Sequence, residues 1–390
     1  MKKHLLVKIV CLFCIVSFTA AQAKITTNSN TTMITQTINA WMKKNNIPGV
    51  AVETYEKGVL HSYYFGYANR ETKKPINSKT IFEIGSLTKL FTSLLFAIEI
   101  DANKANLTDS IANYLPEIIT QSNSPLRKIT LQNLATHTAA LPFTLPDTIK
   151  TQADLDSFLS KWNPPYPIGK QWAYSNVGIG LLGNSLELIT HENFNQLYRG
   201  RILQPLGMEP IGIIVPKRLL SNYAQGYNDQ GTAVQRDQIN LLFPASGDMK
   251  VSAHDMLRFL KAAIGLPGVP VAIAHAMQIT QISYVSTVNM NQGLGWSIYP
   301  EVENHKVELL DPPETMIMGP IPAKQFNKNE YKFDGNALID KTGATDGFRS
   351  YIAVIPNKKS GIVILANRSA SNGEIMRVGR KILFNVIGSI

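Results

Sequence analysis

Apolar residues recur at the spacing of β-strands near both ends of the 390-residue chain. Val50 to Tyr55 and Val59 to Tyr67 predict a strand pair, because a short turn-forming run separates them. Near the C-terminus, Arg349 to Ile355 and Gly361 to Asn367 predict a hairpin for the same reason. Strands therefore cluster at the two ends of the chain, where they can join one sheet.

The last periodic segment, Met376 to Ile387, predicts a helix with one apolar face. We expect Val378, Ile382, Leu383 and Val386 to point inward, and Arg377, Arg380 and Lys381 to point outward. Helical patterns also fill the middle of the chain. This order predicts an α+β fold in which residues 24–100 and 285–390 build one α/β domain and residues 101–284 form a mostly helical domain.

Residues 1–23 have the pattern of a signal peptide. Three lysines precede a largely apolar stretch from Ile9 to Ala20, and Ala21-Gln22-Ala23 fits a small-x-small cleavage site. The apolar stretch is too short to span a membrane, and no later run of about 18 apolar residues follows. We expect export to a bacterial periplasm, with no membrane anchor after cleavage; the alternative is a first structural helix.

Both cysteines of the chain, Cys11 and Cys14, lie in this signal segment, so the mature chain would form no disulfide bond. Neither follows the small residue that precedes a lipidated cysteine. Removal of three lysines and no acidic residue lowers the formal charge from +10 to +7. That charge suits anionic partners, but no basic run with interleaved aromatic residues occurs, so nucleic-acid binding is not expected.

The seven histidines are scattered singly, with no two at ligand spacing on one predicted element. We therefore expect no metal site, and no motif indicates a cofactor. His137 is interpreted as a structural residue rather than a catalytic one. The absence of a heptad repeat or a long apolar patch predicts a monomer.

The first candidate for chemistry is Ser86-Leu87-Thr88-Lys89, which follows Gly85 at the start of a helical apolar pattern. Residues three apart share a helix face, so the Lys89 amine is expected beside the Ser86 hydroxyl. A buried lysine can lose its charge and accept the serine proton, which makes the serine a nucleophile for acyl transfer. Alone this signal is weak, because an ordinary amphipathic helix often contains it by chance.

The second candidate is Tyr174-Ser175-Asn176, which stands between a Pro- and Gly-containing loop and a helical pattern. A phenol beside ammonium groups can lose its proton well below pH ~10 and serve as a general base. Asn176 offers donors and an acceptor, which suit an amide group or the orientation of a lysine. If this cluster is considered alone, the alternative to a general base is a structural role for Tyr174.

The third candidate is Lys341-Thr342-Gly343, which lies between two predicted strands. Gly343 allows a substrate to approach the strand backbone closely, and Lys341 supplies a cation for a carboxylate or for a neighbouring phenol. The backbone N–H groups of Ala344 and Ser86 can form an oxyanion hole. The alternative is an ordinary surface turn.

Together the three clusters resemble the serine β-lactamase and penicillin-binding protein superfamily. A Tyr-x-Asn second motif is similar to that of class C β-lactamases and their esterase and peptidase relatives. Other stretches carry the narrower resemblance to class C: Asn46 to Val52, Phe65 to Asn69, Gln204 to Met208, Asn291 to Trp296 and Gly361 to Arg368. The resemblance runs from about Ile47 to the C-terminus.

This resemblance implies a β-lactamase/transpeptidase-like fold, an antiparallel sheet flanked by helices beside a mostly helical domain, with the active site in the cleft between them. It implies hydrolysis of β-lactam antibiotics through an acyl-enzyme intermediate, with Ser86 as the nucleophile. Lys89 and Tyr174 would share the proton transfer, and which of the two is the base stays open.

The resemblance also implies the remaining roles in this site. The N–H groups of Ser86 and Ala344 would stabilise the oxyanion, and Lys341 would lie near Tyr174 and the substrate carboxylate. The other substrate-binding positions would be Asn176, Thr342, Gly343 and Asn372.

Several positions depart from the class C pattern. Thr144 stands where a glutamine often contacts the substrate amide, and residues 244–250 lack the tyrosine usually found in that loop. Asp346 and Arg349 replace small or uncharged residues, and they either form a surface ion pair or reshape the rim of the cleft.

These departures leave the preference among penicillins, cephalosporins and carbapenems open. They also leave two alternative functions. One is an esterase or D,D-peptidase that uses the same serine. The other is a penicillin-binding protein that is acylated without turnover.

Overall fold

The computed structural model describes residues 29–56, 58–116, 121–236, 239–314 and 318–388. The predicted signal segment, with both cysteines, lies outside the described residues. One ten-stranded sheet has the order β11-β7-β8-β9-β12-β13-β14-β1-β2-β3. Its strands are β1 (Gly49–Glu56), β2 (Val59–Asn69), β3 (Lys74–Pro75), β7 (Val285–Ser286), β8 (Asn291–Gln292), β9 (Ser297–Tyr299), β11 (Lys324–Gln325), β12 (Leu338–Ala344), β13 (Arg349–Ile355) and β14 (Ser360–Ala366).

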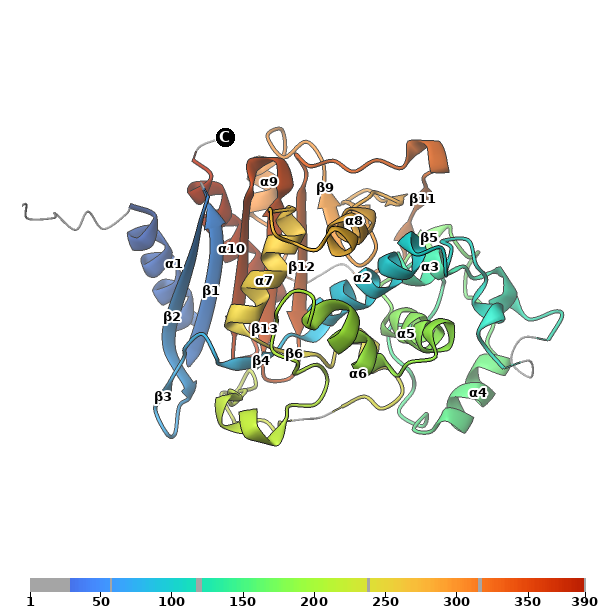
Figure 1. Ribbon diagram of the computed structural model, residues 1–390, viewed down its shortest axis with the longest axis horizontal. Coiled ribbons are helices and arrows are strands. Elements are labelled where there is room, and N and C mark those ends of the chain that lie inside the picture. Colours follow the sequence, from blue (N-terminus) through green and yellow to red (C-terminus); the bar gives the residue numbers. More distant parts are fainter. Residues whose placement is uncertain (1–28, 57, 117–120, 237–238, 315–317, 389–390) are drawn as a thin grey trace, which may run out of the picture.

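Both predicted strand pairs are confirmed. β1 pairs antiparallel with β2, and β13 pairs antiparallel with β14. β1 also pairs antiparallel with β14, with Val50 opposite Ala366, so strands from the two ends of the chain are neighbours in the sheet. The expected antiparallel sheet built from both ends is therefore present (Figure 1).

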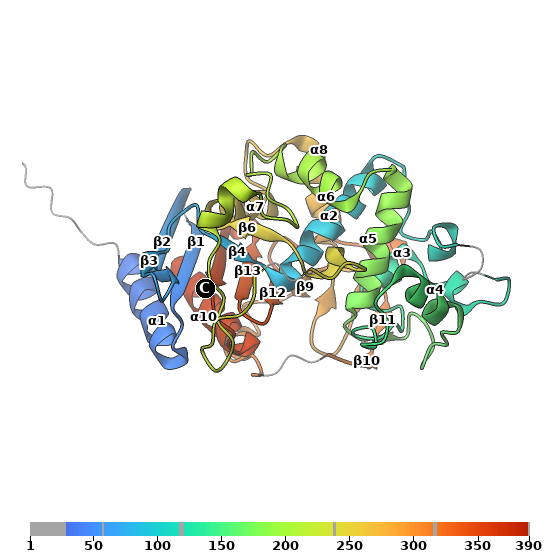
Figure 2. The same cartoon turned by 90° about the horizontal axis from the view of Figure 1, so that it is seen from below.

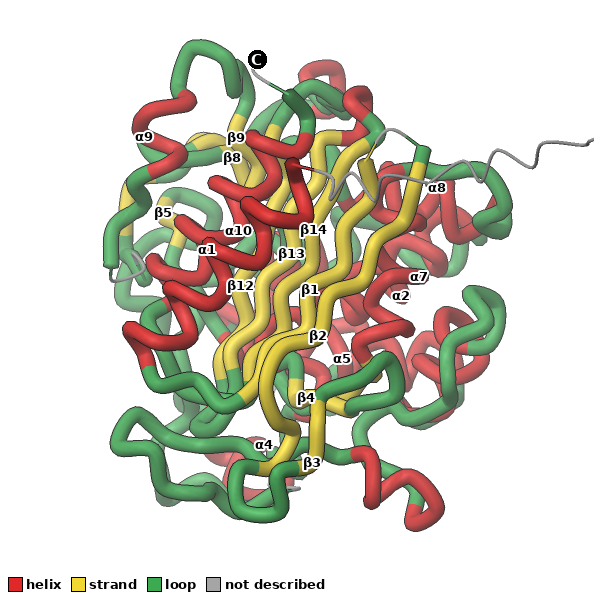
Figure 3. The backbone as a smooth tube through the Cα atoms, turned by 90° about the vertical axis from the view of Figure 1, so that its left-hand side faces the viewer, coloured by secondary structure: helices red, strands yellow, loops and turns green. Residues whose placement is uncertain are grey.

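Helices cover both faces of the sheet because its central strands are apolar on both sides. In β14, Ile362 and Ile364 face the cluster that contains α1 (Ser29–Asn45) and α10 (Asn372–Val386). Figure 3 shows these two helices across the strands. The alternate residues Val363 and Leu365 belong to the larger cluster on the other face, where α7 (Ala253–Ile264) packs on β1, β13 and β14.

The helix predicted at the C-terminus is confirmed, but the prediction for one of its residues is wrong. Arg380 was expected to point outward, and its side chain is instead only 2% exposed. It forms a buried ion pair with Asp340 of β12, at 2.7 Å from Nη2 to Oδ2. A carboxylate buried in the sheet needs such a partner, and the periodicity of one helix does not show a charge that lies on another element.

The remaining helices lie mostly beside the sheet (Figure 2). They are α2 (Thr88–Asp101), α3 (Leu131–Ala135), α4 (Gln152–Ser160), α5 (Asn176–Thr190), α6 (Phe194–Leu197), α8 (Val271–Thr280) and α9 (Lys306–Leu310). Four short strands form two separate pairs: β4 (Ile81–Glu83) with β6 (Lys250–Ser252), and β5 (Gln171–Trp172) with β10 (Ile321–Pro322). The predicted division into two domains stays a prediction. One helix of residues 101–284, α7, packs on the sheet and not only on other helices.

Candidate active site

Ser86 and Lys89 lie one turn apart at the start of a buried helix. Ser86 belongs to a short 3₁₀ turn, Gly85–Leu87, that leads directly into α2. Most side chains of α2 are buried, and this helix carries Lys89 into the interior, where its side chain has no exposed surface. Lys89 Nζ lies 3.1 Å from Ser86 Oγ. The lysine is therefore within direct proton-transfer distance of the serine hydroxyl.

Two further oxygen atoms hold the Lys89 amine in place. Asn176 Oδ1 lies 2.7 Å from Nζ, and the backbone carbonyl of Ser246 accepts a hydrogen bond at 2.5 Å. Asn176 is the first residue of α5, and Ser175 caps that helix by accepting a hydrogen bond from Gly178 N at 2.9 Å. The cap fixes where α5 begins, and so fixes the position of the amide that contacts Lys89.

Tyr174 lies between two lysines. Its ring centre is 5.0 Å from Lys89 Nζ and 4.7 Å from Lys341 Nζ, and its side chain is 7% exposed. Burial raises the pKa of the phenol, but the charges of Lys341 and Lys89 outweigh burial and lower that pKa to about 8. Burial lowers the pKa of Lys89, a charged Tyr174 opposes this change, and Lys341 adds to it. The site therefore offers a phenol that ionises near pH 8 and a lysine amine that loses its proton more readily than an exposed one.

Two glycines allow the nucleophile turn to rest directly on β12. Gly85 has φ +50°, and a Cβ atom there would lie 2.6 Å from Ala344 N. A Cβ atom on Gly343 would lie 2.0 Å from Ile84 O. Both distances are shorter than real Cβ contacts allow, so only glycine permits this approach. The approach places the backbone of Ser86 next to that of Ala344, as an oxyanion hole formed by their N–H groups requires.

Two residues that contact this cluster were not predicted as part of the site. Ser246 acts through its backbone carbonyl, which any residue type provides, so the sequence carries no signal for it. His137 was interpreted as structural, and it is 2% exposed with its ring centre 4.4 Å from that of Tyr174. Its Nδ1 accepts a hydrogen bond from Ser175 N at 3.2 Å, so this histidine supports the loop that carries the tyrosine.

The structure brings together Ser86, Lys89, Tyr174, Asn176 and Lys341. Asn372 is the first residue of α10, and its role in substrate binding stays a prediction. The alternative of an Asp346–Arg349 ion pair is absent from the described residues. The Arg349 guanidinium instead donates to carbonyl groups, such as Thr345 O at 2.7 Å, and to Ser369 Oγ.

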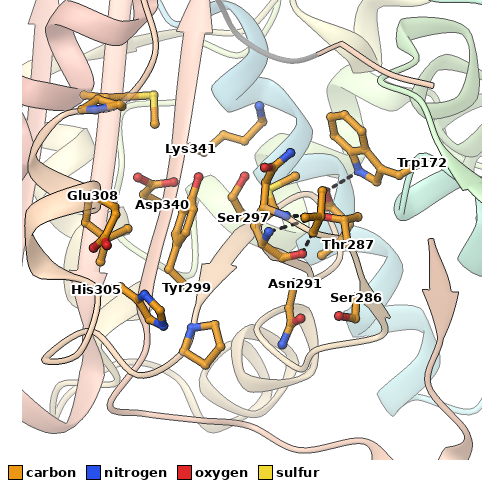
Figure 4. A pocket seen from close by; sticks show the side chains of 18 of the residues that line it. Trp172, Ser286, Thr287, Asn291, Ser297, Tyr299, His305, Glu308, Asp340 and Lys341 are labelled. Carbon is orange, nitrogen blue, oxygen red and sulfur yellow. Dashed lines mark hydrogen bonds between the residues drawn. The ribbon is translucent and has the colours of Figure 1, made fainter. Parts of the chain in front are cut away.

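A cavity of about 680 Å³ opens beside the cluster. Tyr174 and Thr342 line it. Lys341, Tyr299 and His305 line it as well (Figure 4). Over the described ranges, no group of three or more histidine, cysteine, aspartate or glutamate side chains could hold a metal ion. None of the helices in that part of the chain is long and apolar enough to cross a bilayer.

The comparisons with known proteins agree with this fold. A family model described as "Beta-lactamase" matches residues 34–383. A beta-lactamase of Lysobacter lactamgenus is 32% identical, with 95% of this chain and 96% of that protein covered. A beta-lactamase of Escherichia coli (strain K12) is 33% identical, with 87% of this chain and 89% of that protein covered.

Solved structures agree as well. A class C beta-lactamase in complex with cefoxitin superposes with a TM-score of 0.84, is 30% identical and covers 91% of this chain and 98% of its own. A beta-lactamase/D-alanine carboxypeptidase from Pseudomonas syringae also has a TM-score of 0.84 and 30% identity, over 91% of this chain and 99% of its own.

The fold and the serine–lysine–tyrosine cluster define a serine hydrolase with a β-lactamase/transpeptidase-like fold. The chain belongs to the beta-lactamase family, and its structural neighbours are class C enzymes.

Proposed function

We propose that this protein hydrolyses β-lactam antibiotics through an acyl-enzyme intermediate on Ser86. The observation that carries the proposal is the 3.1 Å distance between Lys89 Nζ and Ser86 Oγ, with the lysine side chain fully buried. A serine activated in this way attacks a carbonyl carbon, and family membership points to the strained β-lactam ring as the carbonyl source.

The reaction divides into two steps. Ser86 Oγ forms a bond to the β-lactam carbonyl carbon while its proton moves to Lys89 or Tyr174, and the carbon–nitrogen bond of the ring then breaks as the nitrogen takes a proton. A water molecule next attacks the ester carbon, releases the opened product and returns the proton to Ser86. Because Lys89 and Tyr174 are coupled, they titrate as a pair, and either can be the base.

Backbone and side-chain groups around Ser86 would stabilise the charges on the substrate. We assign the N–H groups of Ser86 and Ala344 to the oxyanion, at about 3–4 kcal/mol for each donor. Lys341 and Thr342, which line the cavity, would bind the substrate carboxylate. Asn176 would contact the amide of the acyl side chain, with Gly343 leaving room at the strand.

Purified protein mixed with a chromogenic cephalosporin tests the proposal. Repeated turnover supports hydrolysis, and a single burst equal to the enzyme concentration supports a penicillin-binding protein without turnover. Ser86→Ala should reduce turnover at least a thousandfold while the protein keeps its thermal unfolding temperature. A higher residual rate would contradict the assignment of the nucleophile.

A D-alanine carboxypeptidase is the second candidate function. It is favoured by the Pseudomonas syringae relative, whose name includes both activities, and by a D-alanine carboxypeptidase from Burkholderia cenocepacia that is 30% identical. Both reactions need the same acylation of Ser86 and differ in the leaving group. Release of D-alanine from a peptide ending in D-Ala-D-Ala, compared with cephalosporin turnover, distinguishes the two.

We also propose a periplasmic location after removal of residues 1–23. The lysines, apolar stretch and Ala21-Gln22-Ala23 of the N-terminus support it. Expression in a Gram-negative host followed by mass measurement of the periplasmic fraction should give a chain that begins at Lys24. A chain with an intact N-terminus in the cytoplasm would contradict this location.

A further inference from the structure

A second cavity, of about 180 Å³, lies beside the catalytic cluster and shares no lining residue with the larger one. We refer to it as the side pocket. Its charged walls come from the three segments that carry the site. Glu83 lies three residues before the nucleophile, Asp248 two residues after Ser246, and Asp346 two residues after Ala344. An acyl group bound at the nucleophile would therefore have the side pocket as its neighbour.

A buried lysine without a hydrogen-bond partner lines the side pocket. The side chain of Lys250 is only 2% exposed, and its Nζ atom makes no hydrogen bond to any of the described residues. Its charge acts on Asp248, which lines the same pocket, but no oxygen atom of the described residues accepts a hydrogen bond from Nζ. A buried ammonium group without an acceptor is unfavourable. An acceptor oxygen from a ligand would remove this cost.

The same pocket also carries three carboxyl groups. Glu83 accepts a hydrogen bond from Tyr223 Oη at 2.6 Å, and Asp248 Oδ2 accepts one from the backbone N–H of Asn240 at 2.6 Å. Asp346 also lines the pocket, and its side chain is exposed. Burial raises the pKa of Asp248 to about 6, so this carboxyl is mostly ionised at pH 7.

A ligand with one charge fits this arrangement poorly. A carboxylate at Lys250 would meet the three acidic groups, and an ammonium group among the carboxylates would leave Lys250 Nζ without a hydrogen-bond acceptor. A ligand that carries both charges on one carbon satisfies both requirements. We propose that the side pocket binds the zwitterionic α-amino acid end of a substrate's acyl side chain, with its carboxylate at Lys250 and its ammonium group at Asp346.

The proposal rests on the function proposed above, since the acyl side chain must be attached to a substrate of Ser86. It names a substrate class, namely acyl groups that end in an α-amino acid, such as the α-aminoadipyl group. That group can come from a β-lactam or from a cell-wall peptide. The two sources share the recognition chemistry and differ in the leaving group.

A matched pair of cephalosporins provides the test. Cephalosporin C and adipyl-7-aminocephalosporanic acid have the same nucleus and chain length, and only the first carries the ammonium group. If the β-lactam is the source, we expect kcat/KM for cephalosporin C to exceed that for the adipyl compound by up to about fivefold, the effect of one exposed ion pair. Equal values both for this pair and for the same two acyl groups on D-Ala-D-Ala peptides would overturn the proposal.

Two substitutions locate the preference in the side pocket. Asp346→Asn should reduce the ratio of the two kcat/KM values toward one. Lys250→Met should lower kcat/KM for both compounds with a carboxylate on the acyl side chain, relative to cephalothin, whose acyl side chain is uncharged. Asp147→Asn changes an exposed aspartate that lines neither cavity and should leave both comparisons as in the wild type. A preference that survives both pocket substitutions would place the binding elsewhere and overturn the proposal.

Binding measurements separate this inference from the function itself. If the wild type hydrolyses none of the three cephalosporins, the proposed function fails. The Kd values of cephalosporin C and the adipyl compound, measured by calorimetry on the Ser86→Ala protein, then test binding in the side pocket independently of hydrolysis. Tighter binding of cephalosporin C supports it, and equal Kd values reject it. The same two acyl groups can also be attached to D-Ala-D-Ala and their kcat/KM values compared. If the group with the ammonium is preferred only on these peptides, the natural source of the acyl group is a cell-wall peptide.

Discussion

Lys341 Nζ lies 4.7 Å from the centre of the Tyr174 ring, although 167 residues separate the two along the chain. The contact follows from the way β12 and the start of α5 face the same cavity. A cation at this distance favours the phenolate, so Lys341 acts on the tyrosine before any substrate arrives. The charge of Lys341, in the Lys341-Thr342-Gly343 cluster, therefore acts on the phenol of the Tyr174-Ser175-Asn176 cluster.

Replacement of Lys341 should change the pH dependence of the reaction. Without this charge the pKa of Tyr174 should rise above its value of about 8, so the acidic limb of the kcat/KM profile should move to higher pH in Lys341→Met. A shift of one pH unit lowers the rate at pH 7 about tenfold. Steady-state kinetics between about pH 5 and pH 10 measure the limb.

Lys341→Arg is the matched control, because it keeps the charge and should keep the acidic limb near that of the wild type. A neutral ester separates the two roles of the lysine. If Lys341→Met leaves the limb in place and harms only substrates with a carboxylate, then Lys341 binds substrate and does not tune Tyr174. If kcat/KM falls equally for esters and β-lactams and the acidic limb shifts, then Lys341 tunes the pKa of Tyr174.

The close approach of Gly85 to β12 predicts a large effect of one methyl group. Gly85→Ala should lower the free energy of unfolding by about 2 kcal/mol or more and should reduce kcat strongly, because the new Cβ atom would lie 2.6 Å from Ala344 N. Gly268→Ala is the control. That residue also has positive φ (+85°) but has nothing within 4 Å of a Cβ atom, so it should lose only about 1 kcal/mol. Urea unfolding measures both, and equal losses would show that φ strain alone matters.

The sequence predicts the contact between Ser86 and Lys89 and the position of Tyr174 because local rules place these residues. The three-residue spacing of Ser86 and Lys89 sets their contact, and loop-to-helix chemistry places Tyr174 at the start of α5. The central strands were predictable because their apolar runs are long. Their order could not be predicted, because it depends on which distant strands pair.

The failures have a common physical origin. Arg380 was expected to be outside because its helix was considered alone, whereas its partner Asp340 lies 40 residues away on β12. Ser246 contacts Lys89 through a backbone carbonyl, which leaves no mark in the sequence. In both cases the missing information is a contact between elements that are far apart in the chain.

A buried carboxyl group far from the reaction predicts a pH-dependent stability. Glu53 of β1 is fully buried and accepts hydrogen bonds from Ser62 and from Tyr64 Oη, the latter at 2.9 Å. Burial raises its pKa from 4.5 to about 7, and the two hydrogen bonds oppose that change. The folded state therefore holds this proton more tightly than the unfolded chain does. Its stabilising effect is complete below about pH 4.5 and is lost as the pH rises through about 7.

Glu53→Gln keeps a neutral hydrogen-bonding group of the same size. Near pH 8.5 it should raise the free energy of unfolding by up to about 3 kcal/mol relative to the wild type, whereas near pH 5 the two should differ little. Urea unfolding at the two pH values measures the difference. Glu303→Gln, at a carboxylate that is 67% exposed, should show no such pH dependence. If the Glu53→Gln protein gains nothing at the higher pH, then Glu53 is ionised in the fold without cost.

The buried ion pair between Arg380 and Asp340 predicts the largest loss of stability in the sheet region. Both side chains are 2% exposed, and Asp340 Oδ2 also accepts a hydrogen bond from Tyr351 Oη at 2.7 Å. Arg380→Met would leave a buried carboxylate without its cation, so the free energy of unfolding should fall by about 3–5 kcal/mol.

Arg377→Met is the matched control on the same helix. Its partners Asp311 and Glu314 are 83% and 58% exposed, so this change should cost less than about 1 kcal/mol. The double change Asp340→Asn with Arg380→Met removes the unpaired charge and should recover a part of the loss. Because Asp340 immediately precedes Lys341, a loss of kcat that the double change also restores would show that the pair holds β12 in position for catalysis. Equal unfolding energies for Arg380→Met and Arg377→Met would contradict a buried pair.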